Sequence, residues 1–322
     1  LIILYYRGHL LTLLVKNYAN TPYMKKIFIA IIFAALFSSV SRSQTKTHFE
    51  YPTAPDSLAT LQEKTSYIVL RFWDKADMKK LLNDTLAFNE AFADYVSFIP
   101  YASADSVKKS IVNLTSRYKN DAKSTLKIVK AAEKNLFSAE APFWADEQYM
   151  LFTKAALSNK KISAKDKTHY LNHVKMLNGS QVGSTALPMT YTTRHGAVHQ
   201  LYDQPGEFTL LYIHSPECKD CDMISLRLET DFAVNSLSKN GTLKIVDIYT
   251  GTPDENWKKS VEKYPYEWEA GTSDDIGEYI DIRNLPAMYL LDKDRKIILR
   301  DMNVNQALSM ASAIYKQQQK QQ

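Results

Sequence analysis

The sequence predicts two unlike halves: an all-α N-terminal domain, and after it an α/β domain whose central mixed sheet is flanked by helices. Two observations support this fold class. Up to residue 180, apolar residues recur at intervals of three and four, which is the spacing of one helix face. Beyond residue 185, short β-rich apolar runs alternate with helical segments. The boundary is expected where Gly179, Gly183 and Pro188 interrupt the helical pattern.

Residues 1–43 are interpreted as an upstream extension followed by a secretory signal peptide. Translation is expected to start at the first methionine, Met24, so residues 1–23 are untranslated or form an extra membrane-contacting segment. Two lysines precede the apolar run 27–37, and small residues follow it up to Gln44, the expected first mature residue. A membrane span needs about twenty apolar residues, so this shorter run predicts export, with no integral membrane span in the mature chain.

Length and charge limit the classes of function. About 280 mature residues are enough for two domains. The net charge of +5 arises from 40 basic and 35 acidic residues that are mixed along the chain. Because no basic block interleaves with aromatic residues, no nucleic-acid partner is expected. The polar tail, residues 316–322, is expected to be disordered.

Residues 45–180 predict the all-α domain, because each apolar-periodic segment is separated from the next by capping or breaking residues. The expected helix starts are Asp56–Ser57, Asp77, Ser103 or Asp105, Asp121, Pro142 and Lys165. Its core is expected to contain the aromatic residues Phe72, Trp73, Phe88, Phe92, Tyr95, Trp144 and Tyr149, with a ligand groove as the alternative. His169 and His173 share one helical face and could hold a metal. No carboxylate or cysteine accompanies them at matching spacing, so solvent-facing positions are expected.

The elements of the second half follow in order, over residues 185–318. A hairpin is predicted over 189–202, with Arg194, His195 and Gly196 in its turn. The other predicted strands are 208–213, 243–249, 287–291 and 296–300, and the predicted helices are 219–237, 257–263 and 305–316. Strands alternating with helices in this way are typical of an α/β sheet.

The only two cysteines, Cys218 and Cys221, lie at the turn between the strand 208–213 and the helix after it. Cys218 is expected near the first helical position, where free N–H groups and the helix dipole stabilise a thiolate. Cys221, three residues on, can close a disulfide with it and reopen. A purely structural disulfide is the weaker alternative, since so short a loop constrains the unfolded chain little. A zinc site would need further ligands that the sequence does not supply nearby.

A strand, a C-x-x-C helix, a second strand, a helix, and then Asn284-Leu285-Pro286 before an apolar strand and hairpin together resemble the thioredoxin fold. The hairpin upstream of the first core strand is similar to the TlpA/ResA-like thiol–disulfide oxidoreductases of the bacterial envelope. This resemblance implies that Pro286 is a cis-proline beside the disulfide and turns Leu285 toward a substrate chain. The helical half resembles an uncharacterised domain found ahead of such domains in exported Gram-negative proteins, which implies a periplasmic location.

Several residues depart from the family pattern. Glu217 replaces the usual tryptophan before the first cysteine, Lys219 and Asp220 lie between the cysteines, and Tyr212 replaces the buried acid. The candidates for the missing proton acceptor are Glu217, Asp220 and Asp222. Their carboxylates oppose thiolate formation, so a low reduction potential is expected, which suits a reductant or isomerase rather than a strong oxidant. His214 could tune the pKa of the first thiol, although a packed or solvated strand end is expected.

The predicted mechanism is thiol–disulfide exchange, in which Cys218 attacks a partner disulfide and Cys221 resolves the mixed disulfide. The partners would be protein dithiols or disulfides and an unidentified electron donor, with no cofactor other than the redox-active disulfide. Two other classes stay open. A peroxiredoxin would combine Cys218 with Ser215, but the proline of that motif is Leu211 here. A non-catalytic envelope binding protein with a degenerate thioredoxin-like domain is the second alternative.

Overall fold

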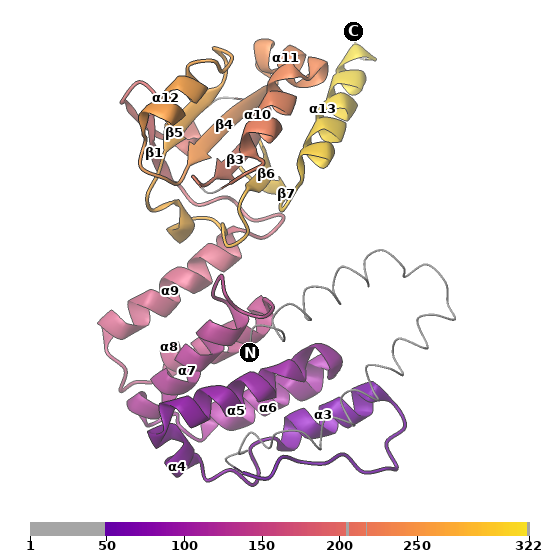
Figure 1. Ribbon diagram of the computed structural model, residues 1–322, viewed down its shortest axis with the longest axis vertical. Coiled ribbons are helices and arrows are strands. Elements are labelled where there is room, and N and C mark those ends of the chain that lie inside the picture. Colours follow the sequence, from indigo (N-terminus) through magenta and orange to yellow (C-terminus); the bar gives the residue numbers. More distant parts are fainter. Residues whose placement is uncertain (1–48, 204–205, 217, 321–322) are drawn as a thin grey trace.

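The computed structural model describes residues 49–203, 206–216 and 218–320. It contains a helical half and an α/β half that lie one beyond the other along the long axis of the molecule (Figure 1). The all-α and α/β classes predicted for the two halves are both confirmed. The predicted extension and signal peptide, residues 1–43, lie outside the described residues. No helix in the described ranges is both long and apolar enough to cross a bilayer.

The helical half consists of helices joined by short connections. These are α3 (Leu61–Arg71), α4 (Met78–Asn83), α5 (Thr85–Ser97), η2 (Ile99–Tyr101), α6 (Ala104–Ser116), α7 (Ala122–Leu136), α8 (Asp146–Ser158) and α9 (Ala164–Gly179). Predicted capping residues begin several of them, because an Asp or Ser side chain accepts a hydrogen bond from a free N–H of the first turn. Such caps are Asp77, Ser103 and Asp121.

Three predicted helix bounds are wrong. The continuous helix expected from residue 78 to 99 is divided, because Asp84 accepts from the N–H of Ala87 and starts α5. The first helix begins at Leu61 rather than after Asp56–Ser57, since Thr60 and Glu63 form a capping box there. α8 begins at Asp146, four residues after Pro142, because the N–H of Ala145 is held by the carbonyl of Leu136.

The aromatic core of the helical half is confirmed except at one position. The buried members are Phe72, Trp73, Phe88, Phe92, Tyr95 and Tyr149. Trp144 is 42% exposed instead. Its indole N–H donates to the carbonyl of Ser138, and its ring contacts the guanidinium of Arg283 at 4.9 Å. An indole with both a polar contact and a cationic neighbour needs no place in the apolar core.

The α/β half is built on a seven-stranded sheet with the order β2-β1-β5-β4-β3-β6-β7. Its elements are β1 (Thr190–Thr193), β2 (Val198–Gln200), η3 (Leu201–Asp203), β3 (Phe208–His214), α10 (Cys221–Thr230), α11 (Phe232–Lys239), β4 (Leu243–Tyr249), α12 (Glu255–Val261), β5 (Glu269–Thr272), η4 (Ile276–Glu278), β6 (Ala287–Asp292), β7 (Ile297–Leu299) and α13 (Val304–Gln319). The strands β3, β4 and β5 are parallel, whereas β1, β2, β6 and β7 pair antiparallel with their neighbours. Helices α10, α11 and α13 share an apolar cluster with β3 and β4, which places them on one face of the sheet.

This half also departs from the prediction in three places. Strand β5 was not expected. The helix predicted over 219–237 is two helices, because Asp231 accepts from the N–H of Val234 and starts α11. The tail expected to be disordered continues α13 to Gln319, and Gln318 donates to the Thr242 hydroxyl at 2.6 Å. That bond fastens the last turn of α13 to the chain just before β4.

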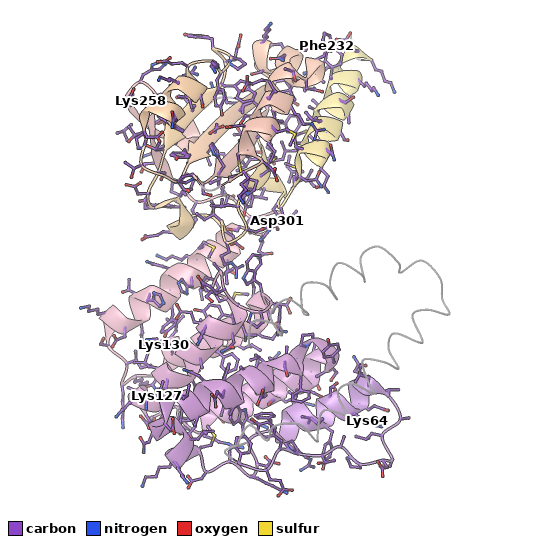
Figure 2. All side chains as sticks on the ribbon, viewed as in Figure 1. Lys64, Lys127, Lys130, Phe232, Lys258 and Asp301 are labelled. Atoms are coloured by element: carbon purple, nitrogen blue, oxygen red, sulfur yellow. A yellow bond between two sulfur atoms is a disulfide. The ribbon has the colours of Figure 1, made fainter. Side chains whose placement is uncertain are left out.

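The two halves meet at a compact ionic network. The Arg283 guanidinium forms two hydrogen bonds with the Asp146 carboxylate on α8, at 2.9 and 3.0 Å, and a third with the carbonyl of Phe137 at 3.1 Å. Asp281 accepts from Arg283 and from Arg300. Arg300 also bonds Asp301, which lies on the side of the α/β half that faces the helical half (Figure 2). Arg283 therefore joins both halves directly.

Candidate functional site

The two cysteines lie where β3 ends and α10 begins, and a disulfide joins them with their Cα atoms 5.5 Å apart. Cys221 is the first residue of α10 and only 5% exposed, whereas Cys218 is half-buried in the preceding turn. Cys218 is therefore the more exposed of the two cysteines, while Cys221 is covered by its own helix and the sheet. This asymmetry is what an attacking and a resolving thiol require.

The start of the cysteine helix differs from the prediction. Cys218 was expected near the first helical position, but α10 begins three residues later. The reason is a turn in which the N–H of Cys218 donates to the carbonyl of Ser215. Cys218 thus precedes the helix, and Cys221 is the sulfur that lies within its first turn, where the dipole acts most strongly.

The peptide bond between Leu285 and Pro286 is cis, as the family resemblance implied. Pro286 directly precedes β6, whose first residue, Ala287, pairs with Ile213 near the end of β3. Because β3 leads into the cysteine turn, the sheet register brings the cis peptide and that turn to the same edge. Leu285 is half-buried there and packs against the apolar cluster on the sheet face opposite α10.

The residues predicted to tune the cysteines differ in their burial and contacts. Lys219, Asp220 and Asp222 are all exposed to solvent, and Glu217 lies outside the described residues. His214 was expected to be packed or solvated at a strand end. It is packed: His214 is buried, with Nε2 2.9 Å from Oδ1 of Asp247. This pairing ties the last residue of β3 to the neighbouring strand β4.

Asp247 is the buried carboxylate that sequence reasoning missed. It is fully buried in the middle of β4, opposite Tyr212 in the parallel register. Alternate residues of a strand face the same side, and Leu243 and Ile245 of β4 pack in the cluster that contains Cys221. Asp247 therefore faces the side covered by the cysteine helix. In the family pattern the buried acid stands on β3, at the position of Tyr212. Here the carboxylate of Asp247 lies on the neighbouring strand β4, directly beside that position.

Asp247 affects the pKa values of two neighbouring tyrosines. Burial, and then the charge of Asp247, raise the pKa of the Tyr212 hydroxyl well above its usual value. The same two causes raise the pKa of Tyr264, whose hydroxyl donates to Ser225 of α10 at 3.1 Å. Oδ2 of Asp247 makes no hydrogen bond with the described residues.

The cysteines line neither of the two cavities described in this half. One of them, of about 450 Å³, is lined by residues that include Arg194, His195, Gly241 and Lys244. These residues flank the beginning of β4, whereas the cysteines lie beyond the end of β3, which runs parallel to β4. The cysteine site thus lies at the other end of the parallel strands from this cavity.

Comparison with known proteins separates the two halves. Residues 37–180 match a family model described as a domain of unknown function, DUF5106. This match confirms that the helical half resembles an uncharacterised domain. No curated protein matches the chain.

A solved thioredoxin-like protein from Bacteroides caccae superposes with a TM-score of 0.55 and 21% identity, covering 82% of this chain and 98% of that one. The α/β half has the thioredoxin fold. A C-terminal domain of an uncharacterised Bacteroides fragilis protein is 29% identical over 42% of this chain and 99% of that one, with a TM-score of 0.38. The thioredoxin domain of a Bacteroides vulgatus thiol–disulfide oxidoreductase is 22% identical over 42% of this chain and 98% of that one, with a TM-score of 0.37. The finer TlpA/ResA-like grouping stays a prediction.

Proposed function

We propose that the protein is an exported thiol–disulfide oxidoreductase that reduces or exchanges the disulfides of other envelope proteins. The observation that supports this most directly is the Cys218–Cys221 disulfide ahead of α10, with one sulfur half-buried and the other buried. Its position at the edge of a thioredoxin fold, outside both cavities described in that half, suits a polypeptide substrate better than a small molecule.

In the proposed reaction, the reduced enzyme begins with a Cys218 thiolate. The thiolate attacks a partner disulfide, forming an enzyme–partner disulfide and releasing one partner sulfur, which takes up a proton. Cys221 then loses its proton and attacks Cys218, so the second partner sulfur leaves. Two electrons pass from the enzyme dithiol to the partner, and a donor dithiol restores the enzyme. No metal or organic cofactor takes part.

Asp247 is proposed to accept the proton of Cys221. It is buried, lies on the strand behind the cysteine helix and has one oxygen without a hydrogen-bond donor among the described residues. His214 holds the other oxygen at 2.9 Å and fixes the orientation of the carboxylate. This role replaces the other candidates, Asp220 and Asp222, whose side chains are exposed and do not lie on the buried strand behind Cys221.

The loop that ends at Pro286 is proposed to hold the substrate chain. Because Pro286 has no N–H of its own, the neighbouring Leu285 backbone is proposed to pair with an extended partner segment. The exposed carboxylates at the turn oppose a stable thiolate, which favours a low reduction potential and a reducing or isomerising role. The apolar run 27–37 after Lys25 and Lys26 supports export, to the periplasm of a Gram-negative cell.

The test is the reduction of insulin disulfides by the purified chain with a dithiol donor. Turnover is expected with the wild-type chain and is expected to be lost in Cys218→Ser. Absence of turnover in the wild-type chain, with its disulfide reducible by the donor, would instead indicate a binding protein with a degenerate thioredoxin domain. Peroxide consumption without insulin reduction would indicate a peroxidase.

A further inference from the structure

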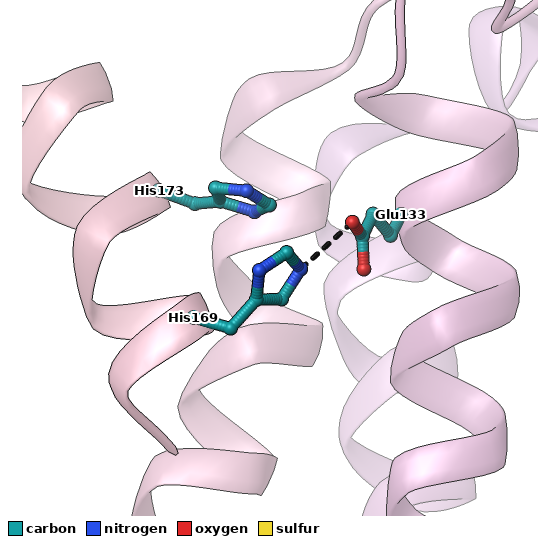
Figure 3. A group of neighbouring side chains, drawn as sticks. All are labelled: Glu133, His169 and His173. Atoms are coloured by element: carbon teal, nitrogen blue, oxygen red, sulfur yellow. Dashed lines mark hydrogen bonds and ion pairs between the residues drawn. The ribbon is translucent and has the colours of Figure 1, made fainter. Parts of the chain in front are cut away.

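Three metal-ligating side chains meet between two helices of the helical half, far from the cysteines in the sequence. Glu133 lies on α7, and His169 and His173 lie on α9 (Figure 3). One potential ligand atom from each lies within 4.8 Å of the others, and Nε2 of His169 is 2.9 Å from Oε1 of Glu133. The sequence pattern offered no carboxylate at matching spacing, but the packing of α7 against α9 supplies one.

We propose that Glu133, His169 and His173 form a binding site for a zinc-class divalent transition-metal ion. Histidines four apart lie one above the other on a helix, so two imidazoles converge from one side. A carboxylate from the facing helix completes a set of two nitrogen ligands and one oxygen ligand. Three protein ligands of this kind leave a position open for water or another small donor.

The geometry requires only a small contraction. Zinc holds nitrogen and oxygen ligands at about 2.1 Å, which places neighbouring ligand atoms about 3.4 Å apart in a tetrahedral arrangement. The present separations reach 4.8 Å. The His169 side chain is 52% exposed and can turn without disturbing the core. Glu133 already approaches His169 to hydrogen-bond distance.

The surroundings of His173 hold its ring in a fixed orientation. One ring nitrogen, Nδ1, is 2.7 Å from the Tyr149 hydroxyl, which leaves the other free for a metal. Phe137 stacks on the ring with centroids 4.3 Å apart. A hydrogen bond to the non-ligating nitrogen and close packing are the supports that metal-binding histidines generally have. His173 is thus prepared as a ligand, and His169 and Glu133 can close on the same ion.

A bound ion would join α7 to α9 beside the junction of the two halves. The Phe137 ring, which stacks on His173, also lies 4.7 Å from the Arg283 guanidinium. The carbonyl oxygen of Phe137 accepts a hydrogen bond from the same guanidinium. The metal site is therefore one aromatic ring away from the arginine that holds the α/β half. This inference is independent of the proposed redox function, because none of its residues belongs to the cysteine site.

The experiment is a calorimetric titration of zinc chloride into the full chain, with any affinity tag removed and the disulfide intact. The oxidised state is essential, because reduced cysteines bind zinc themselves. One equivalent is expected to bind, and cobalt is expected to give the visible absorption of a four- or five-coordinate ion. Loss of an outer-shell partner generally costs about 10- to 100-fold in affinity, so loss of a ligand is expected to cost at least as much.

His169→Ala and Glu133→Gln remove ligands at partly exposed positions, so both variants are expected to fold, which circular dichroism checks. His195→Ala, a change at an exposed histidine of the other half, is the matched control and is expected to bind as tightly as the wild-type chain. Folded His169→Ala and Glu133→Gln with wild-type affinity would overturn the proposal. So would an oxidised wild-type chain that binds no zinc at a hundred micromolar.

Discussion

Among single residues, the unequal exposure of the two cysteines supports the attacking and resolving roles proposed for them. Cys218 is half-buried, whereas Cys221 is 5% exposed. The chain with Cys221→Ser is therefore expected to accumulate a mixed disulfide with a disulfide-containing peptide, because nothing resolves it. Non-reducing electrophoresis and mass spectrometry measure the adduct. Cys218→Ser is the matched control, and an equal yield of adduct from that variant would contradict the assignment.

The proposed role of Asp247 as the proton acceptor for Cys221 can be tested by removing its charge. Asp247→Asn keeps the shape of the side chain but removes the proton acceptor proposed for Cys221. Resolution of the mixed disulfide is expected to slow by about 100-fold at neutral pH, the usual contribution of a positioned base. The rate is expected to recover as pH rises past about 8.5, where a thiol ionises unaided. Stopped-flow rates across pH measure this.

Asp222→Asn serves as the control for Asp247→Asn, since Asp222 is an exposed carboxylate on α10, next to Cys221. It is expected to leave the pH profile unchanged. If Asp247→Asn lowered the rate equally at all pH values, Asp247 would only support the packing of β4, and the proton would leave Cys221 by another route.

At the scale of helices and strands, aspartate caps decide where helices begin. The caps at Asp77 and Asp121 are visible in the sequence because each precedes a fresh apolar pattern. Asp84 and Asp231 were missed, since an aspartate within a continuous pattern is equally compatible with a solvent-facing helical position. Strand β5 was missed because Glu269-Ala-Gly-Thr272 has no β-rich alternation, and pairing with β4 and β1 holds it in place.

The residues of the two candidate sites also differ in how far the sequence could predict them. The C-x-x-C pair is a local pattern that the sequence predicts directly, whereas the role of Pro286 follows only from the resemblance to the thioredoxin fold. Asp247 and Glu133 act through residues on other elements, the first through strand register and the second through helix packing. Periodicity within one segment carries no information about which strand or helix lies beside it, so neither contact could be predicted.

The cap that Asp84 provides for α5 can be tested by substitution. Its side chain is exposed and accepts a hydrogen bond from the N–H of Ala87, so its main contribution is the cap of α5. Asp84→Ala is expected to lower the free energy of unfolding by about 1 kcal/mol, while Asp84→Ser, which can still cap, recovers most of it. Urea unfolding followed by circular dichroism measures the difference. Glu140→Ala, at an exposed turn, is expected to stay within about 0.5 kcal/mol of wild type.

At the scale of the whole molecule, the helical half is attached to the segment of the α/β half that ends in the cis peptide. Asp281, Arg283 and Pro286 lie within six consecutive residues. Arg283 is held by Asp146 and lies against the rings of Phe137 and Trp144, at 4.7 and 4.9 Å. If that segment contacts a substrate chain, as proposed above, the helical half determines how firmly it is positioned.

The junction is also expected to depend on acidity. Burial alone would raise the pKa of Asp281, but hydrogen bonds and the charge of Arg283 outweigh it and hold that pKa below the usual range. The native state therefore binds a proton less readily than the unfolded state, so this contribution to stability is complete above the unfolded pKa of about 3.9. It is lost as pH falls through the lower pKa of the folded state. Urea unfolding between pH 7 and pH 2 measures the loss, and Asp281→Asn is expected to remove this acid dependence.

Removal of the arginine tests the junction as a whole. Arg283→Ala leaves the carboxylates of Asp146 and Asp281 without their main partner, and breaking a buried pair in this way costs about 3 kcal/mol. Arg283→Lys is expected to recover little, because an ammonium group can neither bond a carboxylate with two donors nor stack between two rings. Arg117→Ala, at an exposed arginine of the helical half, is the matched control and is expected to change stability by less than about 0.5 kcal/mol.

The same Arg283→Ala chain is expected to reduce insulin more slowly while its cysteines react normally with a small thiol reagent. Unchanged insulin reduction in the destabilised variant would show that the helical half anchors the fold without positioning the cis-proline segment.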